Sequence, residues 1–326
     1  MNLKRIIGGP LLSLTFLIFF VCIISSLQWF FTDYLKNINK KVFVGSISNS
    51  FQNTVPEIMV DTTDMVAESR FVIPDKIDTV VAIKSNANIN AKSAISVESD
   101  LYNENIIIFE KNSSLQMPIA SLTKLMTAII VLDNYNLSDV LQVNKLASEQ
   151  VGINQDVEFG DVMTADNFLQ IMLIKSSNRS AYALSEFIGT EKFVDLMNQK
   201  AKSLNLQNTF FVDPTGISSK NVSTVKDLVK LTEYILKNYP KIAETSKIKE
   251  IYIDGFGNVV NTDTLLDEIP EVVCSKTGFT KLAKGCLLLA ISNPQNDDYF
   301  INVVLGADDR FLEMKKIINW SSVECK

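Results

Sequence analysis

Histidine is missing from this chain of 326 residues. Its absence excludes Ser-His-Asp and Cys-His nucleophile pairs, zinc sites with histidine ligands, and a histidine general base. Any proton transfer at neutral pH must therefore use Asp, Glu, Lys, Tyr, Cys or bound water. The zero count thus restricts the chemistry of an active site before any motif is considered.

An excess of basic charge is also absent. The chain has 31 Lys and Arg residues against 37 Asp and Glu residues, a formal net charge of −6, and no Lys/Arg block. This balance argues against a nucleic-acid-binding surface, so no nucleic-acid partner is expected. With only 12 Gly and 8 Pro and with 47% hydrophobic residues, the collagen-like and disordered classes are excluded too.

One long apolar run lies near the N-terminus. No charged residue occurs between Arg5 and Asp33, and the 26 residues from Ile6 to Phe31 are almost wholly apolar. A helix of that length spans about 39 Å, enough to cross a hydrocarbon layer of roughly 30 Å. The run exceeds the usual signal-peptide core and no small-residue cleavage site follows it. We expect residues 1–32 to form a short tip and a transmembrane anchor with 6–31 in the lipid bilayer, although cleavage and the orientation of the span stay open at this point.

The remainder of the chain divides into a linker and a folded domain. Residues 33–88 are polar and lack a sustained apolar period, which predicts a linker, and 89–326 form the expected domain. Hydrophobic periodicity there predicts two strands, a block of helices, three strands and a closing helix. This order predicts an α+β fold, in which the first two strands could join the last three in one sheet. The expected elements cover 94–97, 106–109, 120–134, 165–175, about 179–188, 191–203, 224–238, 271–277, 285–292, 299–306 and 310–320.

Four cysteines are present, and two of them fall in neighbouring predicted strands. Cys274 and Cys286 could pair, but buried free thiols are the favoured interpretation. Cys22 lies in the apolar run and Cys325 is next to last. The cysteines therefore indicate little about the redox compartment.

A serine nucleophile without histidine needs another base, and lysine is the leading candidate. Ser121 and Lys124 are three residues apart at the start of the predicted helix 120–134, so both side chains lie on one face. The unpaired N–H groups of a first helical turn could also face a developing oxyanion. The spacing alone is weak evidence, because it recurs at 223–226 and 246–249.

Two further motifs strengthen the interpretation of Ser121 and Lys124 as nucleophile and base. Ser176 and Asn178 stand in a polar break between two apolar helices, and the Lys-Thr-Gly tripeptide at 276–278 ends a predicted strand. Ser-x-Asn also occurs at 203–205 and 219–221, where we assign it no function. Ser-x-x-Lys, Ser-x-Asn and Lys-Thr-Gly in this order resemble the motif set of penicillin-binding proteins and class A β-lactamases.

The resemblance is closest to the D-alanyl-D-alanine carboxypeptidases among the low-molecular-weight penicillin-binding proteins, serine peptidase family S11, and covers about 90–320. It extends beyond the three motifs to the segments 118–128, 211–216, 261–266 and 275–280. It implies the penicillin-binding-protein and β-lactamase-like transpeptidase fold, an antiparallel sheet with flanking helices and a helical subdomain. Three departures concern substrate fit and turn geometry: Arg179 and Asp213 replace a common Asp and Asn, and the glycine in 283–286 is shifted by one.

The family resemblance implies a catalytic role for each motif. Ser121 would attack the terminal D-Ala-D-Ala bond of a peptidoglycan stem peptide, and Lys124 would accept its proton. An ordinary lysine, with a pKa of about 10.4, is protonated at pH 7, so burial and the neighbouring cation Lys276 would have to lower its pKa. Ser176 would relay the proton to the leaving amine. No cofactor and no metal is expected.

The same resemblance implies the substrate-binding residues. Lys276 and Thr277 would bind the terminal carboxylate, Asn178 would position the substrate amide, and the backbone N–H groups of Ser121 and Phe279 would form the oxyanion hole. The expected binding set is Asn178, Lys276, Thr277, Gly278 and Phe279. β-Lactam antibiotics would acylate Ser121 as inhibitors. Because peptidoglycan lies outside the cell membrane, the resemblance also implies an extracytoplasmic catalytic domain held by a single span, so that 1–32 would comprise a cytoplasmic tip and the transmembrane anchor.

Other activities use related residues. A class A β-lactamase needs a deacylating Glu after Ser-x-Asn, and no Glu occurs from Phe193 to Leu231. A DD-endopeptidase acting on peptidoglycan cross-links would use the same residues as a carboxypeptidase. A catalytically silent peptidoglycan-binding scaffold would be favoured by loss of a motif residue, yet every motif residue is present.

Overall fold

The computed structural model describes residues 88–326 except 104, 153–156, 294–295 and 325–326. The expected anchor at 1–32 and the linker at 33–88, apart from its last residue, lie outside these ranges. Within the described part, no helix combines the length and the apolar character needed to cross a membrane.

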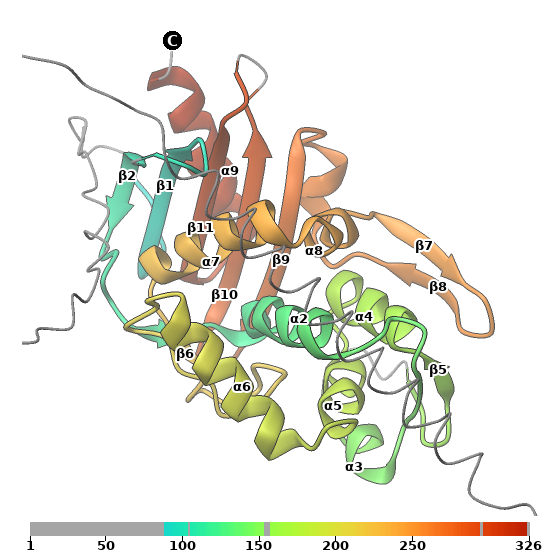
Figure 1. The fold of residues 1–326 in the computed structure, drawn as a ribbon. Coiled ribbons are helices and arrows are strands. Elements are labelled where there is room, and N and C mark those ends of the chain that lie inside the picture. The colour runs from blue at the N-terminus through green and yellow to red at the C-terminus, as the bar shows by residue number, and fades with distance from the viewer. Residues whose placement is uncertain (1–87, 104, 153–156, 294–295, 325–326) are drawn as a thin grey trace, which may run out of the picture. The chain divides into compact units, whose positions relative to one another are not determined.

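A five-stranded antiparallel sheet forms the framework of this domain (Figure 1). Its strand order is β2-β1-β11-β10-β9, so the two early strands join the three late ones as the sequence predicts. β9, which carries the Lys-Thr-Gly motif, is an edge strand and continues two residues beyond Gly278 to Thr280. The strands are β1 (Ser93–Ser99), β2 (Ile106–Lys111), β9 (Val272–Thr280), β10 (Lys284–Ser292) and β11 (Tyr299–Ala307).

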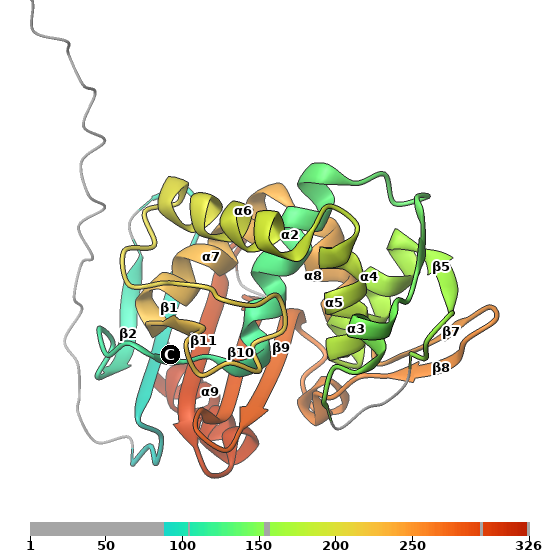
Figure 2. The ribbon, with the colours of Figure 1, turned by 90° about the horizontal axis from the view of Figure 1, so that it is seen from below.

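Each face of the sheet is covered by its own hydrophobic core, because successive strand residues point to opposite sides. Ile95 and Val97 pack into the core that contains most of the helices, whereas Ala94 and Val304 pack under the C-terminal helix α9 (Arg310–Glu324). Figure 2 shows α9 on one side of the sheet and α2, α6 and α7 on the other. The sheet is thus the middle layer of three.

Helix α2 (Thr123–Asn134) occupies the centre of the helical layer. Nine consecutive residues from Thr123 to Val131 are buried, so the helix is enclosed on all sides. Around it are α4 (Ala165–Ile174), α5 (Asn178–Glu186), α6 (Thr190–Ser203) and α7 (Val225–Asn238), each close to its predicted range. The burial of α2 explains how a side chain near its start can be withdrawn from water.

Hydrophobic periodicity does not predict the short elements of this domain, since they are too short to show a period. Three hairpin-like or bridging pairs are β3 with β6, β4 with β5, and β7 with β8. The bounds of the short elements are β3 (Met117–Pro118), η1 (Ala120–Leu122), β4 (Val140–Gln142), α3 (Lys145–Ser148), β5 (Val162–Thr164), β6 (Val222–Ser223), α8 (Pro240–Ser246), β7 (Glu250–Ile253), β8 (Gly257–Val260) and η2 (Thr264–Asp267).

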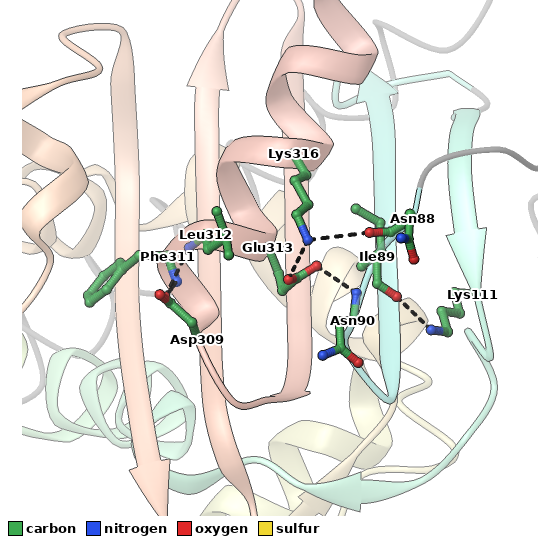
Figure 3. A network of polar contacts seen from close by, with 9 residues as sticks. All are labelled: Asn88, Ile89, Asn90, Lys111, Asp309, Phe311, Leu312, Glu313 and Lys316. Atoms are coloured by element: carbon green, nitrogen blue, oxygen red, sulfur yellow. Dashed lines mark hydrogen bonds and ion pairs between the residues drawn. The ribbon is translucent and has the colours of Figure 1, made fainter.

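The first described segment is tied to α9 and β2 by polar contacts (Figure 3). The backbone N–H of Asn90 donates to Glu313 Oε2 at 2.6 Å, and Lys316 Nζ donates to the other carboxylate oxygen at 2.8 Å. Lys111 Nζ donates to the carbonyl oxygen of Ile89 at 2.7 Å. Because Glu313 is only 3% exposed, these charge-assisted bonds hold the beginning of the domain against the sheet.

Cys274 and Cys286 are free thiols. In the β9–β10 ladder Cys274 lies opposite Ala290, and Cys286 lies opposite Gly278. The two cysteines are therefore four residues out of register, about 13 Å along the strands, which is too far for a disulfide. Burial raises the pKa of Cys274 to about 11 and that of Cys286 to about 12, so both stay protonated.

Candidate active site

The nucleophile segment begins with a strained turn. Pro118 pairs with Val222, and the chain then forms the 3₁₀ turn η1, which contains Ser121, before α2 starts at Thr123. The sequence predicts an α-helix from residue 120, so the structure differs by one 3₁₀ turn. Ala120 has φ of +47°, a left-handed conformation that is costly for an L-residue with a Cβ.

Lys124 is fully buried behind Ser121. Its Nζ lies 3.0 Å from Ser121 Oγ, 2.7 Å from Asn178 Oδ1 and 2.7 Å from the carbonyl oxygen of Thr215. Burial lowers the pKa of Lys124 well below its ordinary value, and the positive charge of Lys276 lowers it further. The structure thus brings the predicted nucleophile and base into contact and gives the lysine an environment that favours its neutral form.

The Ser-x-Asn motif forms the turn between α4 and α5. Ser176 has φ of +62°, and Ser177 caps α5 by accepting a hydrogen bond from the N–H of Ser180 at 3.1 Å. This cap places Asn178 in the first turn of α5. The Asn178 side chain accepts from Lys124 and donates through Nδ2 to the carbonyl oxygen of Val151 at 2.7 Å. Asn178 therefore links the base to the loop at 151–152.

Lys276 completes a chain of contacts from the sheet. Its Nζ donates to Ser176 Oγ at 3.0 Å and to the carbonyl oxygen of Thr277 at 3.2 Å. The side chain is 2% exposed, and burial lowers the pKa of Lys276 to about 7. The carboxylate of Asp263 opposes this shift, whereas the guanidinium of Arg310 adds to it.

Gly278 allows strand β9 to pass directly beside the nucleophile. A Cβ at this position would lie 3.0 Å from the backbone nitrogen of Ser121 and 3.1 Å from the Cβ of Ala120. A side chain would therefore push the strand away from the 3₁₀ turn. Phe279 follows at the mouth of the cleft with 49% of its surface exposed.

The loop after α6 fixes Lys124 from the opposite side, and Asp213 organises it. Asp213 Oδ1 accepts from the backbone N–H groups of Thr215 and Gly216, both at 2.7 Å, and Oδ2 accepts from the N–H of Ser218 at 3.0 Å. An asparagine amide nitrogen could not accept the last of these bonds. The departure from the common Asn is thus matched by an extra backbone donor, and it holds the carbonyl oxygen of Thr215 at Lys124.

These elements surround a cleft of about 440 Å³. Ser121, Ser176, Asn178, Thr277, Gly278 and Phe279 line it, as the sequence predicts for its site, while the Lys124 and Lys276 side chains are buried behind. In the described part of the chain, no group of three Cys, Asp or Glu residues could hold a metal ion. The cleft is further lined by Val151, Gly152, Ile217, Thr262 and Arg310.

Thr262 and Arg310 are polar cleft residues that the sequence argument does not single out. Thr262 Oγ1 lies 2.5 Å from Thr277 Oγ1, and Arg310 Nε is buried without a hydrogen-bond partner in the described ranges. Burial also lowers the pKa of Arg310. Thr262 falls in the recognised segment 261–266, whereas nothing in the local sequence distinguishes Arg310 from any other helix-start residue.

Gly216 provides a test of how tightly the Asp213 loop packs against the nucleophile turn. Its φ is +86°, and a Cβ there would lie 1.9 Å from the carbonyl oxygen of Ala120. Gly255 has φ of +77° with nothing within 4 Å of such a Cβ, so it shares the backbone cost without the collision. We expect Gly255→Ala to lower the free energy of unfolding by about 1 kcal/mol and Gly216→Ala by at least about 3 kcal/mol. Urea unfolding measures both, and equal losses would contradict the close approach.

Comparison with known proteins places this geometry in a family. The family model described as D-alanyl-D-alanine carboxypeptidase, peptidase family S11, matches residues 80–309. The chain is 34% identical to a D-alanyl-D-alanine endopeptidase of Escherichia coli over 230 residues, which are 67% of this chain and 74% of that protein. It is 32% identical to the D-alanyl-D-alanine carboxypeptidase DacF of Bacillus subtilis over 246 residues, 71% of this chain and 62% of that protein.

A solved structure agrees with these matches. The ampicillin-bound form of a penicillin-binding protein from Listeria monocytogenes superimposes with a TM-score of 0.65 at 27% identity, over 72% of this chain and 98% of that one. The three-layer arrangement described above is therefore the fold of the penicillin-binding proteins. Taken with the contact between Ser121 and Lys124, the comparisons establish that the chain belongs to the S11 family of D-alanyl-D-alanine carboxypeptidases.

Proposed function

We propose that this protein is a membrane-anchored serine D-Ala-D-Ala carboxypeptidase, which removes the terminal D-Ala from peptidoglycan stem peptides through an acyl-enzyme. The observation that carries the proposal is the buried Lys124 amine, 3.0 Å from Ser121 Oγ and with a lowered pKa. A neutral amine at that distance can accept the serine proton at neutral pH. A surface lysine, charged and hydrated, could not.

Acylation follows from the contacts around this pair. Neutral Lys124 takes the proton of Ser121 as Oγ attacks the carbonyl carbon of the terminal peptide bond, and the oxyanion forms near the backbone nitrogens of Ser121 and Phe279. When the C–N bond breaks, Ser176 gives its hydroxyl proton to the leaving D-Ala amine and recovers a proton from the protonated Lys124. Lys276 Nζ, 3.0 Å from Ser176 Oγ, orients that hydroxyl.

Deacylation also uses Lys124 in its neutral form as the base. Once the proton has left, Lys124 is again neutral and can accept a proton from water, which attacks the acyl carbonyl. Ser121 Oγ then leaves and regains its proton from Lys124, so the cycle restores the starting enzyme. No residue outside this group is required, which is consistent with the missing histidine.

The end of the cleft supports recognition of a free carboxylate. Thr277 and Arg310 line it, Lys276 is adjacent, and Arg310 Nε is buried without a partner in the described part of the chain. A buried donor of this kind favours an anionic acceptor. A substrate that ends in D-Ala carries such a group at the residue beyond the scissile bond. This arrangement favours a carboxypeptidase over a silent scaffold, because Ser121 contacts Lys124, Ser176 contacts Lys276, and both serines line one cleft.

A DD-endopeptidase is the second candidate, and the Escherichia coli relative named above favours it, since that protein is an endopeptidase at 34% identity. Cross-links between stem peptides also present a carboxylate beside the scissile bond. The described cleft residues serve both reactions, so the two activities differ in the size of the leaving group that the open end of the cleft accepts. Carboxypeptidase activity is our first proposal.

Covalent labelling by a fluorescent penicillin tests the acyl-enzyme. We expect wild-type protein to be labelled on the peptide containing Ser121, Ser121→Ala to lose the label, and Lys124→Ala to be labelled at least about 100-fold more slowly because no base remains. Lys226→Ala is the matched control, since Lys226 follows Ser223 at the same spacing but pairs with Glu110. Labelling of Ser121→Ala at the wild-type rate would refute the nucleophile assignment.

Product analysis separates the two peptidase activities. Purified protein is incubated with a pentapeptide stem and, separately, with a cross-linked dimer, and the products are identified by mass spectrometry. We expect release of free D-Ala from the pentapeptide to exceed cleavage of the dimer, because D-Ala is the smaller of the two leaving groups that the open end of the cleft would have to accept. Cleavage of the dimer alone would assign the protein as an endopeptidase.

The apolar run at 6–31 leads us to propose a single membrane span with the catalytic domain on the extracytoplasmic side, where peptidoglycan lies. We expect the full chain to remain in the membrane fraction after alkaline carbonate washing and a chain lacking residues 1–32 to be released. Protease added to intact spheroplasts should degrade the catalytic domain. Release of the full chain by carbonate, or protection from protease, would contradict the span or its orientation.

A further inference from the structure

Asp263 is a buried carboxylate beneath the Lys-Thr-Gly strand that the mechanism above does not use. It is 4% exposed and caps the short helix η2, where its Oδ1 accepts from the N–H of Leu265 at 2.9 Å. Its Oδ2 accepts from Ser275 Oγ at 2.5 Å. The preceding residue, Thr262, contacts Thr277 through the two hydroxyls. Thr262 and Asp263 therefore contact Thr277 and Ser275, which are two neighbouring positions on one face of β9.

The alternation of β9 places the Ser275 side chain, which Asp263 contacts, and the Lys276 side chain on opposite faces of the strand. Ser275 and Thr277 lie opposite Leu289 and Leu287, which belong to the core under α9. Lys276 lies opposite Leu288, which belongs to the core that contains α2. The Asp263 carboxylate therefore lies across the backbone of β9 from the Lys276 side chain, and both residues are buried.

Charged groups from several elements meet at this point. Lys124 approaches Lys276 from α2, Arg310 approaches from the start of α9, and Asp263 supplies the negative charge from η2. Further out, Asp213 faces Lys124, while Asp309 and Cys286 face Arg310. Of the two charges that act on Lys276, the guanidinium of Arg310 disfavours its ammonium form and the carboxylate of Asp263 favours it, so Asp263 offsets Arg310.

We propose that Asp263 is a positioning residue, whose buried carboxylate, bonded to Ser275 next to Lys276, keeps the ammonium charge on Lys276, while the preceding Thr262 holds the Thr277 hydroxyl that lines the cleft. The inference rests on the proposed function for its consequence in catalysis. The effect of Asp263 on the charge of Lys276 is expected whether or not the protein is a carboxypeptidase.

The pH dependence of activity follows from the direction in which Asp263 shifts the pKa of Lys276 and, through the charge of Lys276, the pKa of Lys124. Asp263 raises the pKa of Lys276 against burial and Arg310, so removing the negative charge lowers that pKa below its present value of about 7. The ammonium form is then lost at a lower pH, and the alkaline limb of activity moves down. Loss of the Lys276 charge also removes one cause of the lowered pKa of Lys124, so the acid limb moves up. The active pH range narrows from both sides.

Asp263→Asn is the test variant, because the amide oxygen can still accept one of the two hydrogen bonds while the charge is removed. The rate constant for acylation by penicillin is measured from pH 5 to 9 together with KM for D-Ala release. We expect a narrower profile, a rate reduced about tenfold at pH 8, and a raised KM. Ser275→Ala, which removes the hydrogen bond but keeps the charge, should retain the wild-type profile shape.

Asp267→Asn is a second control, since this acid lies in the same short helix, has 78% of its side chain exposed and pairs with Lys249. It should behave as wild type. Lysine ¹³C NMR titration of wild type and Asp263→Asn gives a readout independent of activity, with the Lys276 signal expected to titrate at lower pH in the variant. Were Asp263→Asn unable to fold, Arg310→Gln should move the same signal to higher pH.

A rate reduced by the same factor at every pH, with an unmoved Lys276 titration, would overturn the inference and leave Asp263 a purely structural cap. Failure of wild-type protein to react with penicillin would refute the proposed function instead. In that case the lysine titration still decides whether Asp263 sets the charge of Lys276.

Discussion

Removal of one amine from water is the constraint on which the rest of this structure depends. Lys124 can act on Ser121 at neutral pH because α2 is enclosed on all sides and because a second cation, Lys276, lies close by. Desolvation disfavours the ammonium form, and the like charge adds to it. The two N–H groups of the neutral amine can donate to Asn178 Oδ1 and to the carbonyl oxygen of Thr215, and its lone pair can accept from the Ser121 hydroxyl, so the buried amine does not leave unpaired polar atoms.

Holding such an amine requires the backbone to approach from several directions at once. Two glycines permit this: Gly278 where β9 passes the nitrogen of Ser121, and Gly216 where the Asp213 loop meets Ala120. The cost is visible in two non-glycine residues, Ala120 and Ser176, which have positive φ beside the reacting groups. Strain of this kind persists where surrounding packing over-determines the conformation. Beside β9, the negative charge of Asp263 raises the pKa of Lys276 and the positive charge of Arg310 lowers it.

The Ser-x-x-Lys spacing also occurs at 223–226 and 246–249, where the tertiary structure gives it a different role. Ser223 contacts Thr209 and its partner Lys226 pairs with Glu110, while Ser246 donates to the carbonyl oxygen of Ala243 and Lys249 pairs with Asp267. The Lys226 side chain is 36% exposed and the Lys249 side chain 59% exposed, and each is paired with an acid. The same four-residue spacing thus gives a base in one place and a surface ion pair in two others.

The sequence by itself determined the chemistry that is possible and the order of the larger elements, because the missing histidine and the hydrophobic periods are local properties of the chain. It also placed Ser121, Lys124, Ser176, Asn178 and the 276–278 motif in one site, through a family pattern and not through spacing. The 3₁₀ turn at Ser121, the register of the two cysteines, and the approach of Arg310 to the cleft and of Asp263 to β9 follow from the tertiary structure alone. They depend on how strands pair and on contacts such as that between Ser176 and Lys276, 100 positions apart, so no local pattern encodes them.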